Sequence, residues 1–200
     1  MDQHHAPDPA RPAPVEGHAP PSPAEVIDFW RAAGPAKWYA KDDAFDAEIR
    51  ARFEALHHSA ARGECAHWTA DWQGALALLI LLDQFPRNMF RGSGHAFATD
   101  PLARSIARAA LAEGHDQAAP ADLRMFFYLP FEHSEDPADQ DLCLELCRAL
   151  EAAGGPDAGW AVMHRDIIAR FGRFPHRNRT LGRATTGEEQ IFLDEGGFSG

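Results

Sequence analysis

The segment ALALLILL, from Ala75 to Leu82, is the longest uninterrupted run of apolar residues in the chain. Its eight residues are far too few to cross a bilayer, which takes about 20, so we expect no membrane partner. The helix expected from about Asp71 to Phe85 is apolar on nearly every side at this run. Such a helix has no face suited to water. We therefore place it at the centre of the domain, with other helices packed around it.

Start and stop signals divide the rest of the chain into further helices. Ser22 and Glu25 form a capping-box pattern, with Pro23 at the first helical position. Asp100 and Asp136 each precede a proline, so each is expected to cap a helix with its carboxylate. Together with the central helix, the expected helices span residues 23–33, 43–62, 71–85, 100–113, 121–129, 136–153, 158–171 and 187–194.

These patterns predict an all-α fold. No convincing pair of strands and no Asn-Gly hairpin turn is present in the sequence, and about eight helices joined by mostly short links form a single compact bundle. Pro130 is expected to close the short helix at 121–129. Two hundred residues are enough for one domain with a substantial core.

The two ends of the chain are expected to lie outside this domain. The first 23 residues contain seven prolines and no apolar segment of the kind found in secretory signals. We expect residues 1–22 to be a disordered, proline-rich tail. Residues 23–195 then form the single helical domain, and residues 196–200 a flexible C-terminus.

The net charge and the cysteine content restrict the classes of function and the cellular compartment that fit this chain. A net charge of −11 argues against nucleic-acid binding, which needs a basic surface. The three cysteines are too few and too odd in number for a disulfide framework, so a reducing, cytoplasmic location is expected. Cys143 and Cys147 share a helical face and could supply half a metal site, but no second pair with zinc-finger spacing follows. We interpret them as buried small hydrophobic residues.

Side chains capable of chemistry gather at the ends of three helices. The first cluster is LDQFPRNMFRGSGHAFATD (82–100), the second is YLPFEHSEDPAD (128–139), and the third is MHRDIIARFGRFPHRNRTLGR (163–183). Each cluster follows an apolar helix and continues through proline or glycine. Rigid scaffolds present functional loops in this way, so we expect any site to be built from these three segments.

The three clusters also carry a resemblance to a known family. The strings LLDQFPRNMFRG, FFYLPFEHSED and HRDIIARFGRFPHRN occur in this order, and in them the chain closely resembles the bacterial family called domain of unknown function 924. The likeness extends over roughly residues 24–193. It implies an all-helical domain of the tetratricopeptide-like superfamily, a helical stack with a concave face. It implies no activity, and the cofactor stays unknown.

Arginine is unusually dense in the third cluster. Between Arg165 and Arg183 there are six arginines and a single acid, Asp166, although the chain as a whole is acidic. Guanidinium groups grip carboxylates and phosphates with two parallel hydrogen bonds, so these residues suggest a pocket for an anionic small molecule. Candidate ligand-binding residues from the three clusters are Arg87, Asn88, Arg91, Tyr128, Arg173, Arg177 and Asn178.

The arginines also have a purely structural interpretation, in which they pair with carboxylates of the same chain. The second cluster supplies Glu132, Glu135, Asp136 and Asp139, and buried arginine–carboxylate networks can lock helix ends together. The two interpretations are compatible, because a network can occupy some arginines and leave another free for a ligand.

Histidines provide the candidate proton-transfer groups. His133 and His176 lie in loops among acids and arginines, where either could act as a general base oriented by Glu132 or Asp136. The candidate catalytic residues are therefore Glu132, His133 and His176. His164 shares a helical face with apolar residues and fits a core position. Glu132, His133, His164, Asp166 and His176 have the chemistry of metal ligands, but no spacing places two of them on one helical face. No metal is therefore assigned, although the fold could still bring them together.

Two functions from different classes follow. The first is a site for a phosphorylated or carboxylated small molecule where the clusters meet, with catalysis by the histidines as an extension; whether the protein is an enzyme stays open. The alternative is a non-enzymatic tetratricopeptide-like module that binds a protein or peptide along a helical groove, which rests on fold analogy. Convergence of the clusters favours the first, and an open groove with internally paired arginines favours the second.

Overall fold

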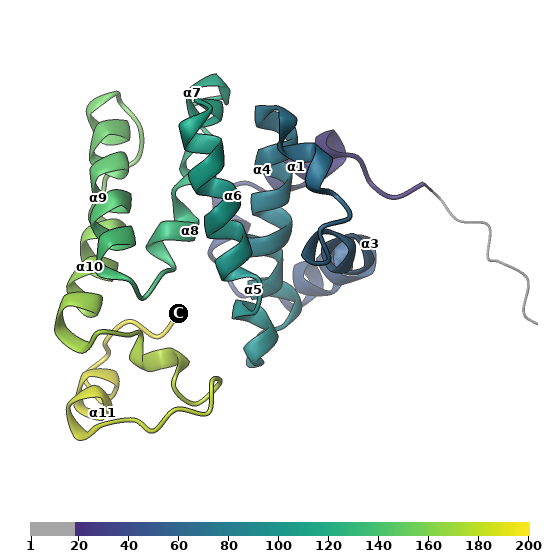
Figure 1. Cartoon of the computed structure of the whole chain (residues 1–200). Coiled ribbons are helices and arrows are strands. Elements are labelled where there is room, and N and C mark those ends of the chain that lie inside the picture. Colours follow the sequence, from purple (N-terminus) through teal and green to yellow (C-terminus); the bar gives the residue numbers. More distant parts are fainter. Residues whose placement is uncertain (1–18) are drawn as a thin grey trace, which may run out of the picture.

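The computed structural model describes residues 19–200, and this part of the chain contains helices and no strands (Figure 1). The predicted all-α fold is therefore confirmed. The longer helices are α1 (Pro23–Ala33), α3 (Asp43–Ala61), α6 (Asp100–Ala112), α9 (Pro137–Ala152) and α10 (Gly159–Phe171). Shorter helices and 3-10 turns join them: α2 (Pro35–Trp38), η1 (Ala66–Ala70), η3 (Gly94–Phe97), α7 (His115–Ala118), η4 (Arg124–Phe127), α8 (Leu129–Glu132), η5 (Pro175–Arg177) and α11 (Gly187–Asp194).

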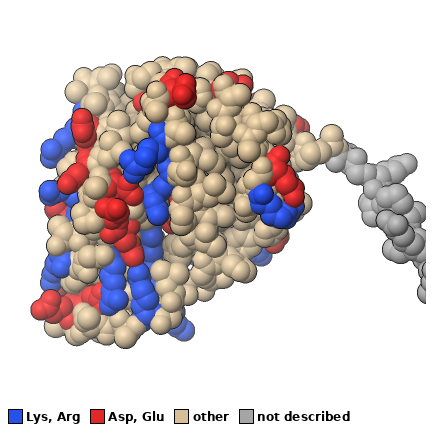
Figure 2. Space-filling view, viewed as in Figure 1, with Lys and Arg blue, Asp and Glu red and all other residues tan. Residues whose placement is uncertain are grey.

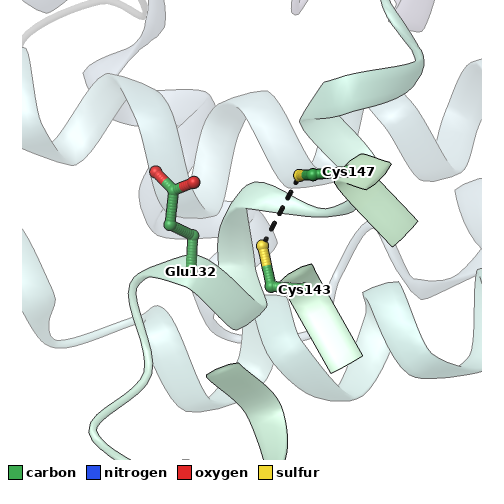
Figure 3. Close-up of side chains that lie close together, drawn as sticks. All are labelled: Glu132, Cys143 and Cys147. Atoms are coloured by element: carbon green, nitrogen blue, oxygen red, sulfur yellow. Dashed lines mark hydrogen bonds between the residues drawn. The ribbon is translucent and has the colours of Figure 1, made fainter. Parts of the chain in front are cut away.

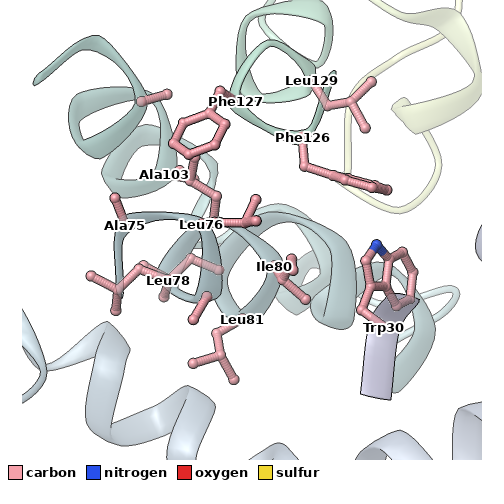
Figure 4. Packing of buried hydrophobic residues seen from close by; sticks show 14 of the residues in the cluster. Trp30, Ala75, Leu76, Leu78, Ile80, Leu81, Ala103, Phe126, Phe127 and Leu129 are labelled. Carbon is pink, nitrogen blue, oxygen red and sulfur yellow. The ribbon is translucent and has the colours of Figure 1, made fainter. Parts of the chain in front are cut away.

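The apolar run forms the centre of the molecule, as predicted. It begins as α4 (Trp72–Leu79), passes through a π-helical turn, η2 (Ile80–Gln84), and continues as α5 (Phe85–Met89). Every residue from 74 to 86 is buried. α4 packs against both α1 and α6, and Figure 4 shows its side chains enclosed by residues of α1, α6 and the segment before α8, among them Trp30 and Phe127.

Most of the predicted helix starts are confirmed, and one is wrong. Ser22 forms a complete capping box with Glu25, and the Asp136 carboxylate accepts from the backbone N–H of Ala138. Asp100 does not cap α6, because Thr99 holds the N-cap position without a side-chain hydrogen bond. The Asp100 carboxylate instead accepts two hydrogen bonds from Arg87, at 3.1 Å each. A tertiary ion pair thus replaces the local cap.

The helix predicted at 121–129 is also wrong in its position. The chain forms the 3-10 turn η4 and then α8, which begins at Leu129 and has Pro130 in its first turn. Proline lacks a backbone N–H, which a helix does not use in its first turn, so Pro130 opens a helix and does not close one. The correction matters because α8 and its C-cap carry Glu132 and His133.

The apolar side chains form two separate clusters. The large core joins α1, α3, α4, α6, α8 and α9, whereas a small second cluster contains Ile167, Ile168 and Phe174, with Phe192 and Phe198 packed against it. α10 lies against α9, and α11 lies below α10 in Figure 1. On the face in Figure 2, positive and negative side chains lie interleaved along the seam between α6 and α9, where Arg104 and Arg108 both pair with Asp139.

The predicted extents of the N-terminal tail and of the C-terminal segment stay predictions. Residues 1–18 of the predicted tail lie outside the described residues. In the segment 196–200, the ring of Phe198 lies 4.7 Å from His164 and 5.0 Å from His176, centre to centre. None of the described helices combines the length and the apolar character that a membrane crossing requires. The tetratricopeptide-like stack stays a prediction.

Candidate functional site

The three polar clusters meet at one place in the fold. His133, at the end of α8, places its Nδ1 2.8 Å from Asp83 Oδ1 in the π-helical turn. Arg177, in η5, donates from Nη1 to the backbone oxygen of His133 at 2.9 Å. We call this place the junction, and its ionisable residues are Asp83, Arg87, Asp100, Glu132, His133, His164, His176 and Arg177.

Asp83 is the anchor of the junction. It is 1% exposed and belongs to the π-helical turn η2, a distortion that frequently marks functional sites. Burial by itself would raise its pKa, but Arg87, 3.3 Å away, and His133 hold that pKa below its ordinary value. Asp83 therefore stays ionised inside the protein and can orient the ring of its histidine partner.

His133 is set up to accept a proton. Because Nδ1 faces the ionised Asp83, the hydrogen lies on Nδ1 and the lone pair on Nε2. Nε2 has no hydrogen-bond partner among residues 19–200 and is not one of the fully buried unpartnered atoms, so it faces solvent. Burial and the nearby Arg87 lower the pKa of His133 to about 4. The ring is thus neutral near pH 7 and has a free lone pair, but a pKa this far below 7 makes it a weak base.

Glu132 points its carboxyl group into the same region without a hydrogen bond. The residue is 6% exposed, and Nδ1 of His164 lies 3.6 Å from its Oε1; burial lowers the pKa of His164 to about 4, so that ring is neutral near pH 7. That nitrogen lies closer to the backbone oxygen of Trp160, at 2.9 Å. Burial and the charge of Asp83 raise the pKa of Glu132 to about 7. The side chain keeps 8% of its surface exposed, so its carboxyl oxygens stay available to a ligand or an ion.

His176 is the second predicted histidine, and it lies in η5 beside Arg177. Its Nδ1 is buried and has no partner in the described part of the chain. The ring packs against Phe174 and Phe198. Burial and then the charge of Arg177 lower the pKa of His176 to about 3, so this ring is also neutral near pH 7.

Most of the predicted arginines are paired within the chain. Each of these arginines contacts a carboxylate of the chain, but only Glu135 among the partners comes from the second cluster, where the partners were expected. Arg87 also contacts Asp83, at 3.3 Å. The pairs are Arg87 with Asp100, Arg91 with Asp46, Arg173 with Glu189, and Arg183 with Glu135. They fasten α5 to α6 and α3, and they fasten the segment after α10 to α11 and to the residues just after α8.

Arg177 is the exception. It is 7% exposed, and its guanidinium lies between the rings of Phe97 and Phe174, 4.6 and 4.4 Å from their centres. The nearest carboxylate oxygen, Oδ2 of Asp100, is 3.8 Å away, and Nε is buried with no partner in residues 19–200. Burial and then the charge of Arg87 lower the pKa of Arg177 to about 10. This guanidinium is therefore held in place but only partly satisfied.

Three other predicted ligand-binding residues do not contribute polar groups to the junction. Asn88 donates to Asp46 at 2.7 Å, beside Arg91. Asn178 donates to Glu189 at 3.1 Å and accepts from Arg183 at 3.0 Å. The hydroxyl of Tyr128 donates to Asp116 at 2.9 Å. In the structure, these side chains hold helices together.

Several junction residues were missed from the sequence. Asp83 interrupts a long apolar run, which could have identified it as a buried charge with a purpose. Asp100 was interpreted as a local cap. Phe97 and Phe198 gave no signal, because ring stacking on Arg177 and on the histidines depends on tertiary packing.

A second polar group lies on the other side of Glu132. Cys143 and Cys147, one turn apart on α9, place their sulfur atoms 3.8 Å from each other. A carboxylate oxygen of Glu132 and both sulfur atoms all lie within 4.8 Å of one another (Figure 3). Within the described residues, no such group of three forms among His133, His164, Asp166 and His176.

Comparison with known proteins identifies the family. Residues 26–197 match the family described as "Bacterial protein of unknown function (DUF924)". The chain belongs to this family. The structure of a protein of unknown function, ATU0120 from Agrobacterium tumefaciens, is similar to this chain, with 53% identity and a TM-score of 0.83. The similarity covers 87% of this chain and 97% of that one. The search of curated proteins gave no match.

Proposed function

We propose that the junction of this DUF924 protein binds a small anionic molecule, a carboxylate or a phosphate, through Arg177. The observation that carries the proposal is the contrast among the arginines. Arg87, Arg91, Arg173 and Arg183 each have a carboxylate at hydrogen-bonding distance, whereas the more deeply buried Arg177 has none closer than 3.8 Å. Because these four arginines are already paired with carboxylates of the chain, we assign anion binding to Arg177 and not to them.

Physical chemistry favours an external partner for Arg177. A guanidinium that is removed from water needs compensating hydrogen bonds or an opposite charge, and Arg177 has one backbone acceptor and an unpartnered Nε. The rings of Phe97 and Phe174 fix its plane, so little conformational entropy remains to be lost when an anion binds. A planar, preorganised donor suits carboxylate and phosphate oxygens.

We extend the proposal to proton transfer on the bound molecule. His133 Nε2 would accept the proton, with Asp83 holding the ring, and Arg177 would stabilise the negative charge that develops. His176 and Glu132 lie beside the same space as secondary candidates. This arrangement supports acid–base chemistry on an anionic substrate and names no particular reaction.

A thermal-shift screen of small carboxylates and phosphates tests the binding proposal. A ligand at about 100 times its Kd adds about 2.7 kcal/mol of stability, which is a rise in Tm of roughly 5–10 °C for a domain of this size. Arg177→Gln should abolish the rise. Arg179→Gln is the matched control, because Arg179 is exposed and two residues away in the same cluster; it should retain the rise. No shift of the wild type with any anion, or an equal shift in both variants, contradicts the proposal.

A further inference from the structure

We propose that Glu132, Cys143 and Cys147 form a binding site for a zinc ion, beside the proposed anion site at Arg177. The two cysteines lie on one face of α9, and Glu132 approaches them from the end of α8 (Figure 3). The zinc proposal does not depend on anion binding at Arg177, because Arg177 makes no contact with Glu132, Cys143 or Cys147 among the interactions of the described chain. It shares Glu132 with the secondary candidates for proton transfer.

The spacing of the sulfur atoms fits tetrahedral zinc. Zinc–thiolate bonds are about 2.3 Å long, and two such bonds at the tetrahedral angle place the sulfur atoms about 3.8 Å apart. Cys143 Sγ and Cys147 Sγ are 3.8 Å apart. The same distance also suits a contact between two thiols, so the sulfur spacing permits a metal ion without requiring one.

A disulfide explains the pair less well. Side chains one turn apart on a helix have Cβ atoms about 5–6 Å apart, whereas a disulfide requires about 3.5–4.5 Å. Both cysteines lie well inside α9, which runs from Pro137 to Ala152, so bond formation would distort that helix. A metal ion between the sulfur atoms bridges the pair with the helix intact.

Glu132 is the independent observation that points to a bound ion. Its carboxyl group is 6% exposed and accepts no hydrogen bond from residues 19–200, although buried carboxyl groups nearly always have partners. One of its oxygens lies within 4.8 Å of both sulfur atoms, against a ligand separation of about 3.5 Å in a tetrahedral zinc site. To complete the coordination, the Glu132 oxygen would have to move closer to the two sulfur atoms, towards this separation.

The ligand set selects the kind of metal. Two thiolates exclude magnesium and calcium, which require oxygen ligands, and favour zinc. Three protein ligands leave a fourth tetrahedral position for water or a ligand, which is the composition of an open site. His164 Nδ1 lies 3.6 Å from Glu132 Oε1 and 2.9 Å from the backbone oxygen of Trp160, so its N–H is directed to Trp160 and not to the carboxylate.

Titration of the metal-free full-length protein with Co²⁺, followed by Zn²⁺, tests the site. The readout is the thiolate-to-cobalt charge-transfer absorption, because binding of Co²⁺ by His4, His5 or His18 does not produce it. We expect the absorption to saturate at about one Co²⁺ per chain and to disappear on addition of Zn²⁺, the tighter-binding ion. Its absence from the wild type overturns the proposal.

Variants assign the ligands. Cys65→Ser is the matched control, since Cys65 is a free buried cysteine elsewhere in the core, and it should retain the absorption. Cys143→Ser and Cys147→Ser should each weaken Co²⁺ binding by at least about tenfold, and Glu132→Gln by a similar factor. Retention of wild-type binding in either cysteine variant or in Glu132→Gln overturns the proposed three-ligand site.

A measurement on the unsubstituted protein tests the site even if a variant fails to fold. Zn²⁺ should slow the alkylation of Cys147, the more exposed of the pair, by at least about tenfold, because a coordinated thiolate is a poorer nucleophile. The rate at Cys65 in the same sample serves as the internal control. Equal alkylation rates of Cys147 with and without Zn²⁺ overturn the proposal.

Discussion

Arg177 and Arg183 differ in their surroundings although they lie six residues apart in the same cluster. Arg183 makes two hydrogen bonds to the Glu135 carboxylate, at 2.7 and 3.0 Å, and a third to the backbone oxygen of Phe174. Arg177 has aromatic faces on two sides and no carboxylate at hydrogen-bonding distance. The composition of the cluster cannot distinguish a structural arginine from one that is free for a ligand.

This difference predicts that Arg183 is a stability residue. Arg183→Met should lower the free energy of unfolding by about 2 kcal/mol, since it removes charged hydrogen bonds to Glu135, Asn178 and Phe174. Arg179→Met, an exposed position in the same cluster, should change it by less than about 0.5 kcal/mol. Urea unfolding measures both, and equal effects would refute the distinction.

The close packing around Gly74 leads to a second prediction about a single residue. A Cβ atom at Gly74 would lie 1.9 Å from the backbone oxygen of Trp68, in the segment before α4. Gly74→Ala should therefore destabilise the protein by at least about 3 kcal/mol, because the backbone has to move in a close-packed region. Gly187→Ala, where no neighbouring atom lies within 4 Å, should change stability by about 1 kcal/mol or less. A tolerated Gly74→Ala would contradict this packing.

Among the elements, α11 depends most on a single side chain. Glu189 accepts from Arg173 at 2.6 and 2.8 Å and also from the backbone N–H of Thr186 at the helix start. Asn178 donates to the same carboxylate at 3.1 Å. One ionised carboxylate thus caps the helix and fastens it to the turn after α10.

The charge of Glu189 predicts a pH dependence of stability. Its hydrogen bonds, above all those from Arg173, lower the pKa of Glu189 to about 2, whereas a glutamate in the unfolded chain titrates near about 4.3. The stabilisation is therefore complete above about pH 4.5 and is lost as the pH falls towards about 2. Urea unfolding between these values should show a smaller pH dependence for Glu189→Gln than for the wild type.

The control for this substitution is Glu188→Gln. Glu188 is an exposed neighbour on α11 and makes no ion pair among residues 19–200. An unchanged pH dependence in Glu189→Gln would show that the carboxylate of Glu189 does not contribute as its contacts imply.

The elements also show which features the sequence could predict. Capping by Ser22, Asp136 and Thr186 depends on groups two or three residues apart, and the central position of α4 follows from its apolar run. The contacts of Asp100 with Arg87 and of Glu132 with the two cysteines join different helices. Local patterns carry no information about such pairs. The sequence could therefore name three clusters but not their internal partners.

At the scale of the whole molecule, the junction lies between a large apolar core and a small one. The small apolar cluster buries only Ile167, Ile168 and Phe174. Polar pairs such as Arg183 with Glu135 supply much of the remaining contact between the C-terminal segment and the rest of the domain. Regions with few buried apolar contacts open more easily than the core. The residues from 173 to 198 should consequently be less stable than α4.

Native-state hydrogen exchange measures this difference. Amides of α11 should exchange through local opening at a free energy well below that of α4, which should exchange only on global unfolding. A bound anion at Arg177 should slow exchange in η5. Equal opening free energies for α4 and α11 would show that the two apolar clusters behave as one unit.

The central claim is that Arg177 is retained for a ligand and not for stability. Urea unfolding of the wild type and Arg177→Met, each with and without the best anion from the screen, tests it directly. Methionine keeps apolar volume between Phe97 and Phe174 and removes an incompletely paired buried charge. We predict that the variant is as stable as the wild type or more stable without the anion, and that only the wild type gains stability with it. A variant that is less stable without the anion and gains as much from it would contradict the claim.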